Sequence, residues 1–109
     1  MKNPGEQIEE YIECLNRSIH EAFNMLEQNE VPDISAMEID IKLMLDTFQF
    51  LKLEESMKYK TEVASIIEKI QSVKEGIAVV LQNIKDEINQ INRDAAAVKP
   101  YEHAANDNG

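Results

Sequence analysis

The run AMEIDIKLMLDTFQFLKL, residues 36–53, decides how the whole chain is interpreted. Its apolar side chains Ile39, Ile41 and Leu43 fall on every second position. Taken alone, a period of two is typical of a half-buried β-strand. The residues on either side of the run read as helix, so the alternation poses a choice between one strand in a helical protein and a helix that is apolar on two sides.

A helix-start pattern directly in front of the run favours the helix. Ser35 and Glu38 stand in the S-x-x-E spacing of a capping box, in which the hydroxyl and the carboxylate each accept from the other residue's backbone amide. Ile34 and Ile39 are spaced for the accompanying hydrophobic staple. We therefore predict a helix over residues 36–54.

On a helix, the apolar residues of this segment form two stripes. One comprises Met37, Ile41, Met44, Phe48 and Leu51, and the other comprises Ile39, Leu43, Phe50 and Leu53. A helix that is apolar on two sides is buried on two sides. We expect this helix to be the central element, between the first and the third.

The flanking segments carry helical periodicity as well. Apolar residues at spacings of three and four predict a first helix over residues 5–28, namely Ile8, Ile12, Leu15, Ile19, Ala22 and Leu26. We predict a tight turn near residues 55–57, with an unbroken helix through this point as the alternative. A third helix over residues 58–99 follows, and Pro100 should end it. Its stripe comprises Tyr59, Val63, Ile66, Ile70, Val73, Ile77, Val80, Ile84, Ile88, Ile91, Ala95 and Val98.

Two details modify the third helix. The step through Ile77, Val80, Ile84 and Ile88 interrupts the heptad rhythm, which favours a bundle helix over a long parallel coiled coil. Gly76 permits close packing or a bend, and a break there would give four helices instead of three. The fold class that follows is all-α, an antiparallel three-helix bundle made of a helical hairpin and a long third helix. Residues 1–99 form one domain, and residues 100–109 form a flexible tail.

The predicted helices differ in length. At 1.5 Å per residue they measure about 35, 27 and 60 Å, so the first helix ends near residues 80–82 of the third. The apolar stripe beyond that level is left uncovered, which marks an interaction site. The candidate residues are Ile84, Ile88, Ile91 and Val98, with Tyr101 as an anchor in the tail. A second copy, the chain's own ends or another protein would cover them.

Charge and composition narrow the classes of partner. Residues 1–55 hold 13 acidic and 4 basic side chains, and residues 56–109 hold 8 and 7. An acidic surface repels phosphate, so nucleic acid is not expected as a partner. The segment MKNPGEQIEE lacks a signal-peptide core, no run has the apolar length of a membrane helix, and Cys14 is the single cysteine. We expect a cytoplasmic protein that does not insert into membranes.

The sequence contains few residues that could catalyse a reaction or bind a metal ion. His20 and His103 are the two histidines, and Arg17 and Pro100 stand where a Glu-x-x-His metal motif needs a glutamate. Cys14 has no neighbouring histidine or basic cluster that lowers a thiol pKa. We therefore expect no enzyme, no catalytic or metal-binding residues and no cofactor.

The acidic first helix, the stripe Ile84–Ile88–Ile91–Val98 and the chain end shortly after Tyr101 resemble the small helical chaperones of flagellar and type III export. The resemblance lies in architecture and covers most of the chain without a diagnostic motif. It implies a cytosolic chaperone or adaptor whose C-terminal stripe holds a substrate helix in helix-in-groove packing. Two other hypotheses stand beside it: an acidic, antitoxin-like inhibitor that blocks a basic partner, and a structural homo-oligomer.

Overall fold

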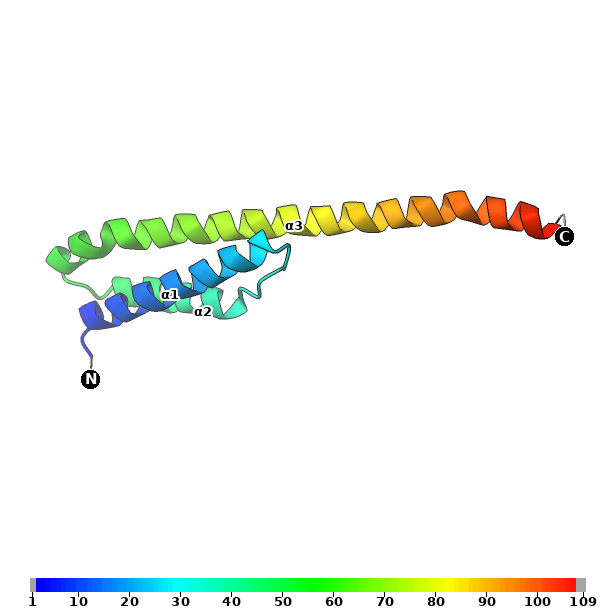
Figure 1. Cartoon of the computed structure of the whole chain (residues 1–109). Helices are drawn as coiled ribbons and strands as arrows, with labels where there is room; N and C mark the ends of the chain where they lie inside the picture. Colours follow the sequence, from blue (N-terminus) through cyan, green and yellow to red (C-terminus); the bar gives the residue numbers. More distant parts are fainter. Residues whose placement is uncertain (1, 108–109) are drawn as a thin grey trace.

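A computed structural model describes the backbone of residues 2–107 and the side chains of residues 2–95. Three helices and no strand occur in this part of the chain: α1 (Pro4–Glu27), α2 (Ser35–Phe48) and α3 (Leu53–Asp107). They run up, down and up, and α3 extends far beyond the other two (Figure 1). The molecule measures 82 × 23 × 19 Å, so its length is the length of α3. The predicted all-α fold class is confirmed, and the run at residues 36–48 is helical.

The start of α1 follows the rules for a helix N-terminus. The Asn3 side chain accepts a hydrogen bond from the backbone amide of Glu6 at 2.9 Å, and Pro4 occupies the first helical position, where a missing amide costs nothing. The predicted α1 stripe is buried from Ile8 to Ala22. Leu26, at its far end, is partly buried against the same core.

The start of α2 differs from the predicted capping box. Ile34 is the N-cap and makes no side-chain cap bond, so the helix begins one residue earlier than the box requires. The amide of Ser35 donates instead to the Asp33 carboxylate at 3.0 Å. The physical reason is that Asp33, two residues upstream, accepts from the Ser35 amide in place of the Glu38 carboxylate to which the box gives this role. Ile34 packs against the core, whereas Ile39 is 61% exposed.

The turn between α2 and α3 lies earlier than predicted. α2 ends at Phe48 instead of residue 54, and α3 begins at Leu53 instead of residue 58. The amides of Phe50 and Leu51 close the end of α2 by bonding to the carbonyls of Thr47 and Phe48. The polar stretch that resembled a turn is the first turn of α3, where Glu54 and Glu55 complement the positive end of the helix dipole.

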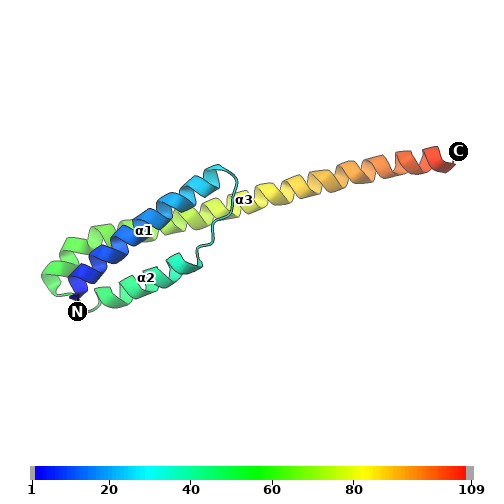
Figure 2. The same ribbon diagram turned by 60° about the horizontal axis from the view of Figure 1, so that its bottom comes forward.

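The helix at the centre of the bundle is α1 and not α2. α1 packs against both α2 and α3 along its length, whereas α2 and α3 approach each other little. Figure 2 shows α1 lying on α3 while α2 stands apart from α3. The expected burial of the second α2 stripe is therefore wrong, because the early end of α2 leaves only Ile39 and Leu43 of that stripe on the helix.

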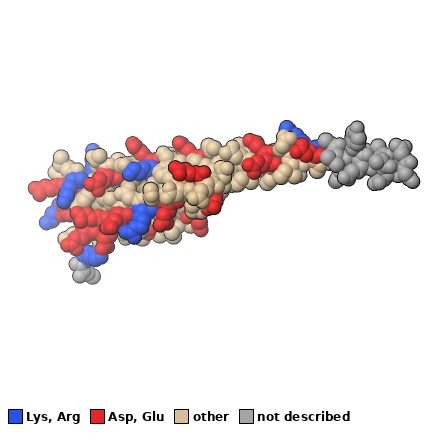
Figure 3. All heavy atoms as spheres, viewed as in Figure 1, with Lys and Arg blue, Asp and Glu red and all other residues tan. Residues whose placement is uncertain are grey.

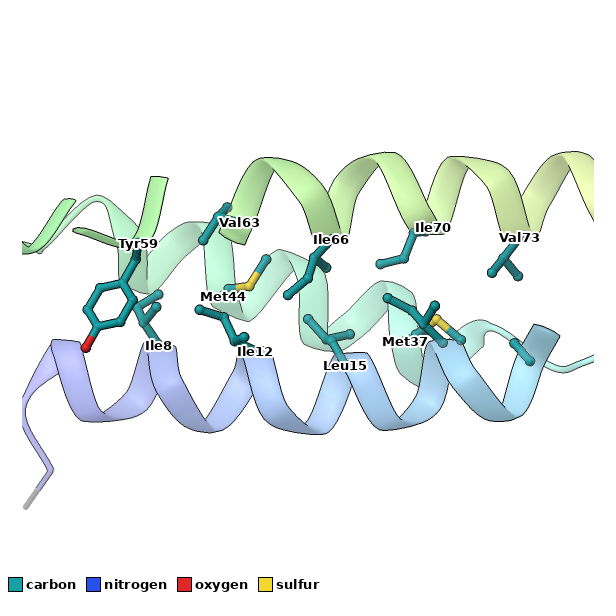
Figure 4. Close-up of a cluster of buried hydrophobic side chains, with 12 residues drawn as sticks. Ile8, Ile12, Leu15, Met37, Met44, Tyr59, Val63, Ile66, Ile70 and Val73 are labelled. Carbon is teal, nitrogen blue, oxygen red and sulfur yellow. The ribbon is translucent and has the colours of Figure 1, made fainter. Parts of the chain in front are cut away.

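The core lies between the three helices and holds one face of each. Figure 4 shows the side chains of α1 and α3 directed toward each other, with two methionines of α2 behind them. Each fully buried aliphatic side chain contributes about 1.5–3 kcal/mol to the free energy of folding. The buried residues of the core are Ile8, Ile12, Leu15, Ile19, Ala22, Met37, Met44, Tyr59, Val63, Ile66, Ile70 and Val73.

α3 is a single helix of 55 residues that passes through both Gly76 and Pro100. The four-helix alternative and the predicted helix end at residue 99 are wrong, and the helix continues into the segment that was expected to form a tail. A proline inside a helix removes one hydrogen bond and ends or kinks the helix, so it is not an obligatory stop. Val80 is the last buried residue in the described part of α3. We call residues 81–107 the arm; it is about 40 Å long.

Candidate interaction surface

One side of the arm is continuously apolar over residues 81–91. Leu81, Ile84, Ile88 and Ile91 are separated by three, four and three residues, which places them on the same side of a helix. Val80, just before them, is only 4% exposed, whereas Ile84, Ile88 and Ile91 are 36%, 52% and 65% exposed. Exposure rises from Val80 through Ile84 and Ile88 to Ile91 because the end of α1 lies against Gly76, Val79 and Val80, and α3 extends beyond the other two helices (Figure 1). We call Leu81, Ile84, Ile88 and Ile91 the arm face.

The arm face agrees in part with the residues singled out from the sequence. Ile84, Ile88 and Ile91 lie together on it and are exposed, as predicted from the unequal helix lengths. Val98 and Tyr101 lie outside the part of the chain whose side chains are described. Leu81, 51% exposed, was missed because the stripe was followed through the adjacent Val80. The signal was present, since Leu81 and Ile88 are exactly one heptad apart.

Two charged flanks border the arm face. Lys85 and Asn92 lie one heptad apart on one side of it, and Glu87 and Asp94 lie one heptad apart on the other. All four side chains are exposed. The Gln90 side-chain amide donates to the Asp94 carboxylate at 3.1 Å, one turn along the helix. We call Glu87 and Asp94 the acidic flank.

A hollow lies at the root of the arm, where α1 ends against α3. Its volume is about 430 Å³, and its lining includes Phe23, Leu26, Glu27, Asn29, Val79 and Val80. Asn29 has a positive φ of 59°, which turns the chain away from α1. Val79 is 59% exposed, so the hollow extends the apolar surface at the arm's base.

Most of the charged side chains lie on the bundle, which is the larger part of the chain. On the face shown in Figure 3, acidic groups cover much of the bundle, with basic groups among them, and uncharged surface covers the root of the arm. Ion pairs between the elements are few and exposed in the described residues; Lys74 of α3 lies 3.9 Å from the Glu38 carboxylate of α2. Exposed pairs of this kind contribute about 0–1 kcal/mol. Most acidic side chains of the bundle are therefore not engaged in ion pairs between its helices.

A second group of exposed apolar side chains lies on α2, in the turn after it and at the start of α3. It consists of Ile39, Leu43, Phe50, Leu53 and Met57, which are between 44% and 76% exposed. We call it the outer α2 face. Asp46 interrupts its helical part, so it is a less continuous apolar strip than the arm face.

Cys14 and His20 lie on the exposed side of α1. The Cys14 sulfur lies 4.0 Å from the Asp40 carboxylate. Across the described residues, no group of three or more His, Cys, Asp or Glu side chains is arranged to hold a metal ion. None of the helices in this part of the chain combines the length and the apolar character that a membrane crossing needs.

Comparison of the chain with protein-family models, with curated proteins and with solved structures gives no match.

Proposed function

We propose that this chain is a protein-binding protein, a cytosolic chaperone or adaptor that holds a partner through the arm face. The observation that carries the proposal is the contrast within α3: the same stripe is buried as far as Val80 and exposed at Ile88 and Ile91. Contiguous exposed apolar surface on a small protein is characteristic of an interaction site. A partner helix laid on the arm would complete the packing that α1 provides in the bundle.

The arm is suited to this role because it is one continuous helix that extends away from the core. A helix of 55 residues projects the face clear of α1 and α2, so a partner reaches it without displacing a core residue. The single cysteine is free and exposed, which fits a reducing compartment. The likeness in architecture to export chaperones supports the same role, since those proteins use a C-terminal helix to hold a substrate.

The experiment compares full-length chains in their own cells. Wild type and I88D/I91D are used as bait, and the co-purifying proteins are identified and quantified. I39D/L43D, on the outer α2 face, is the matched control because it also replaces two exposed apolar residues by aspartate. We expect a stoichiometric partner with wild type and with the control, and its loss with I88D/I91D at unchanged helix content by circular dichroism.

Two outcomes contradict the proposal. The first is equal capture of the partner by wild type and I88D/I91D. The second is a homodimer, seen by light scattering after size exclusion, that I88D/I91D converts to a folded monomer. The second result would make the arm face a self-association surface and the protein a structural homo-oligomer.

A further inference from the structure

We propose that the occupant of the arm face is a basic amphipathic helix of another protein, whose lysine or arginine side chains pair with Glu87 and Asp94. The inference rests on the proposed function and adds the chemistry of the partner. Its support is the position of the charged flanks and of the bundle relative to the arm face.

A second copy in parallel orientation is blocked by the bundle. α3 is one continuous helix, so a parallel copy that covers Ile84 and Ile88 also extends back along residues 53–80. On that stretch the same side of α3 is occupied, because Val80 and the residues before it are buried by α1 and α2. The occupant must therefore lie on the arm beyond Val80.

A second copy in antiparallel orientation places like charges together. Packing the arm face on itself aligns Ile88 with Ile91 of the second copy, and this register sets Glu87 of each copy opposite Asp94 of the other, along one side of the seam. Like charges across such a seam destabilise it, and Lys85 faces the uncharged Asn92. The same acidic flank stabilises a helix that carries basic side chains there.

The root of the arm adds negative potential of the same sign. α1 ends beside it with no basic residue in its last turn, so the negative end of its helix dipole is not compensated there. Glu27, in that last turn, lines the hollow together with the apolar Val79 and Val80. A basic helix that begins at this level has favourable contacts at its end as well as along its flank.

The test uses two synthetic helices that differ only in charge. Both have three heptads with leucine at the two core positions; one carries lysine and the other glutamate at the flanking positions. Fluorescence anisotropy measures the binding of each labelled peptide to the full-length chain. We expect the basic peptide to bind about tenfold more tightly at low ionic strength. The preference should shrink at 1 M salt, where the screening length is about 3 Å.

Two charge-reversal variants separate local pairing from the net charge of −10. E87K/D94K reverses the acidic flank, whereas D46K/E68K changes two exposed carboxylates on the bundle by the same amount. We expect E87K/D94K to abolish or reverse the preference for the basic peptide and D46K/E68K to retain it. I88D/I91D should weaken the binding of both peptides.

Each remaining outcome overturns the inference. Equal binding of both peptides removes the charge requirement, yet leaves the arm face as a binding surface. An equal effect of the two reversal variants assigns the preference to net charge alone. Failure of both peptides to bind shows that the arm face does not accept such a helix, and the capture experiment then decides the proposed function independently. A dimer, seen by light scattering, that the single reversal Glu87→Lys strengthens by placing a lysine opposite the second copy's Asp94 would identify a second copy as the occupant.

Discussion

A β-carbon placed on Gly76 would lie 2.7 Å from Cδ1 of Leu26, at the point where α1 ends against α3. That separation is well inside van der Waals contact. The glycine therefore lets α1 approach α3 closely, and it does so without bending α3, which is helical on both sides of it. This contact lies near the level at which the bundle ends and the arm begins.

Gly76→Ala should have two opposite effects on the free energy of unfolding, a gain in helix propensity and a clash with Leu26. A double-mutant cycle separates them. Alanine is favoured over glycine in a helix by about 1 kcal/mol. In a Leu26→Ala background, where the contact is removed, we expect Gly76→Ala to stabilise the fold by about that amount in urea unfolding. In the wild-type background the gain should be smaller or reversed. Equal gains in both backgrounds would show that the Gly76–Leu26 contact has no energetic consequence.

Tyr59 joins the other end of α3 to α1 by donating its hydroxyl to the Glu9 carboxylate. This hydrogen bond, burial and the charge of Glu9 raise the pKa of Tyr59 from 10.0 to about 12. Because the folded-state pKa lies above the unfolded value, the stabilisation is complete below pH 10 and is lost as the pH rises from about 10 to about 12.

We therefore expect Glu9→Gln to lower the pH at which Tyr59 ionises in the folded protein. The difference in phenolate absorbance between each chain and its Tyr59→Phe counterpart isolates this one tyrosine. The same alkaline midpoint with and without the Glu9 carboxylate would contradict the role assigned to the hydrogen bond.

The N-terminus of α2 should depend on Asp33 and not on the Ser35 hydroxyl. Asp33 accepts the Ser35 amide, and its hydrogen bonds to Ser35 hold the pKa of its carboxyl below the usual 3.8. A lowered folded-state pKa gives stabilisation that is present above pH 3.8 and is lost as the pH falls through the folded value. We expect Asp33→Asn to lose this acid dependence and Ser35→Ala to retain most of it. Thermal unfolding between acidic and neutral pH measures both, and a larger effect of Ser35→Ala would restore the capping box.

Truncations in the bundle and on the arm should differ sharply in their effect on stability. Leu15 is fully buried between the helices, so Leu15→Ala should cost about 2–5 kcal/mol in the free energy of unfolding. Ile91 is 65% exposed, so Ile91→Ala should change it by no more than about 0.5 kcal/mol. Denaturant titration of the two variants tests the boundary at Val80. A large cost for Ile91→Ala would place that residue in an interface of the isolated protein.

The outer α2 face should tolerate charge. Ile39 is 61% exposed and is not part of the core, so Ile39→Lys should alter the free energy of unfolding by less than about 0.5 kcal/mol. Met44→Lys, on the buried side of the same helix, is the contrasting variant and should prevent stable folding. Strong destabilisation by Ile39→Lys would return α2 to the central position expected from its two stripes.

Local patterns in the sequence determined much of this protein. The three- and four-residue spacing from Ile8 to Ala22 and from Tyr59 to Val80 predicted the two faces that form the core, because a helix places such residues on one side. The same spacing carried the arm face through Ile84, Ile88 and Ile91, and the unequal helix lengths predicted their exposure. These conclusions need only the geometry of a single helix.

The tertiary structure decided which helix is central, where α2 ends and how α2 begins. Two apolar stripes on residues 36–53 indicate burial on two sides only if the helix is long enough to carry both, and the turn after Phe48 removes Phe50 and Leu53 from it. The position of that turn depends on packing between helices distant in sequence, which no local pattern contains. The sequence likewise offers two carboxylates, Glu38 and Asp33, as acceptors for the Ser35 amide, and in the folded chain Asp33 makes the hydrogen bond.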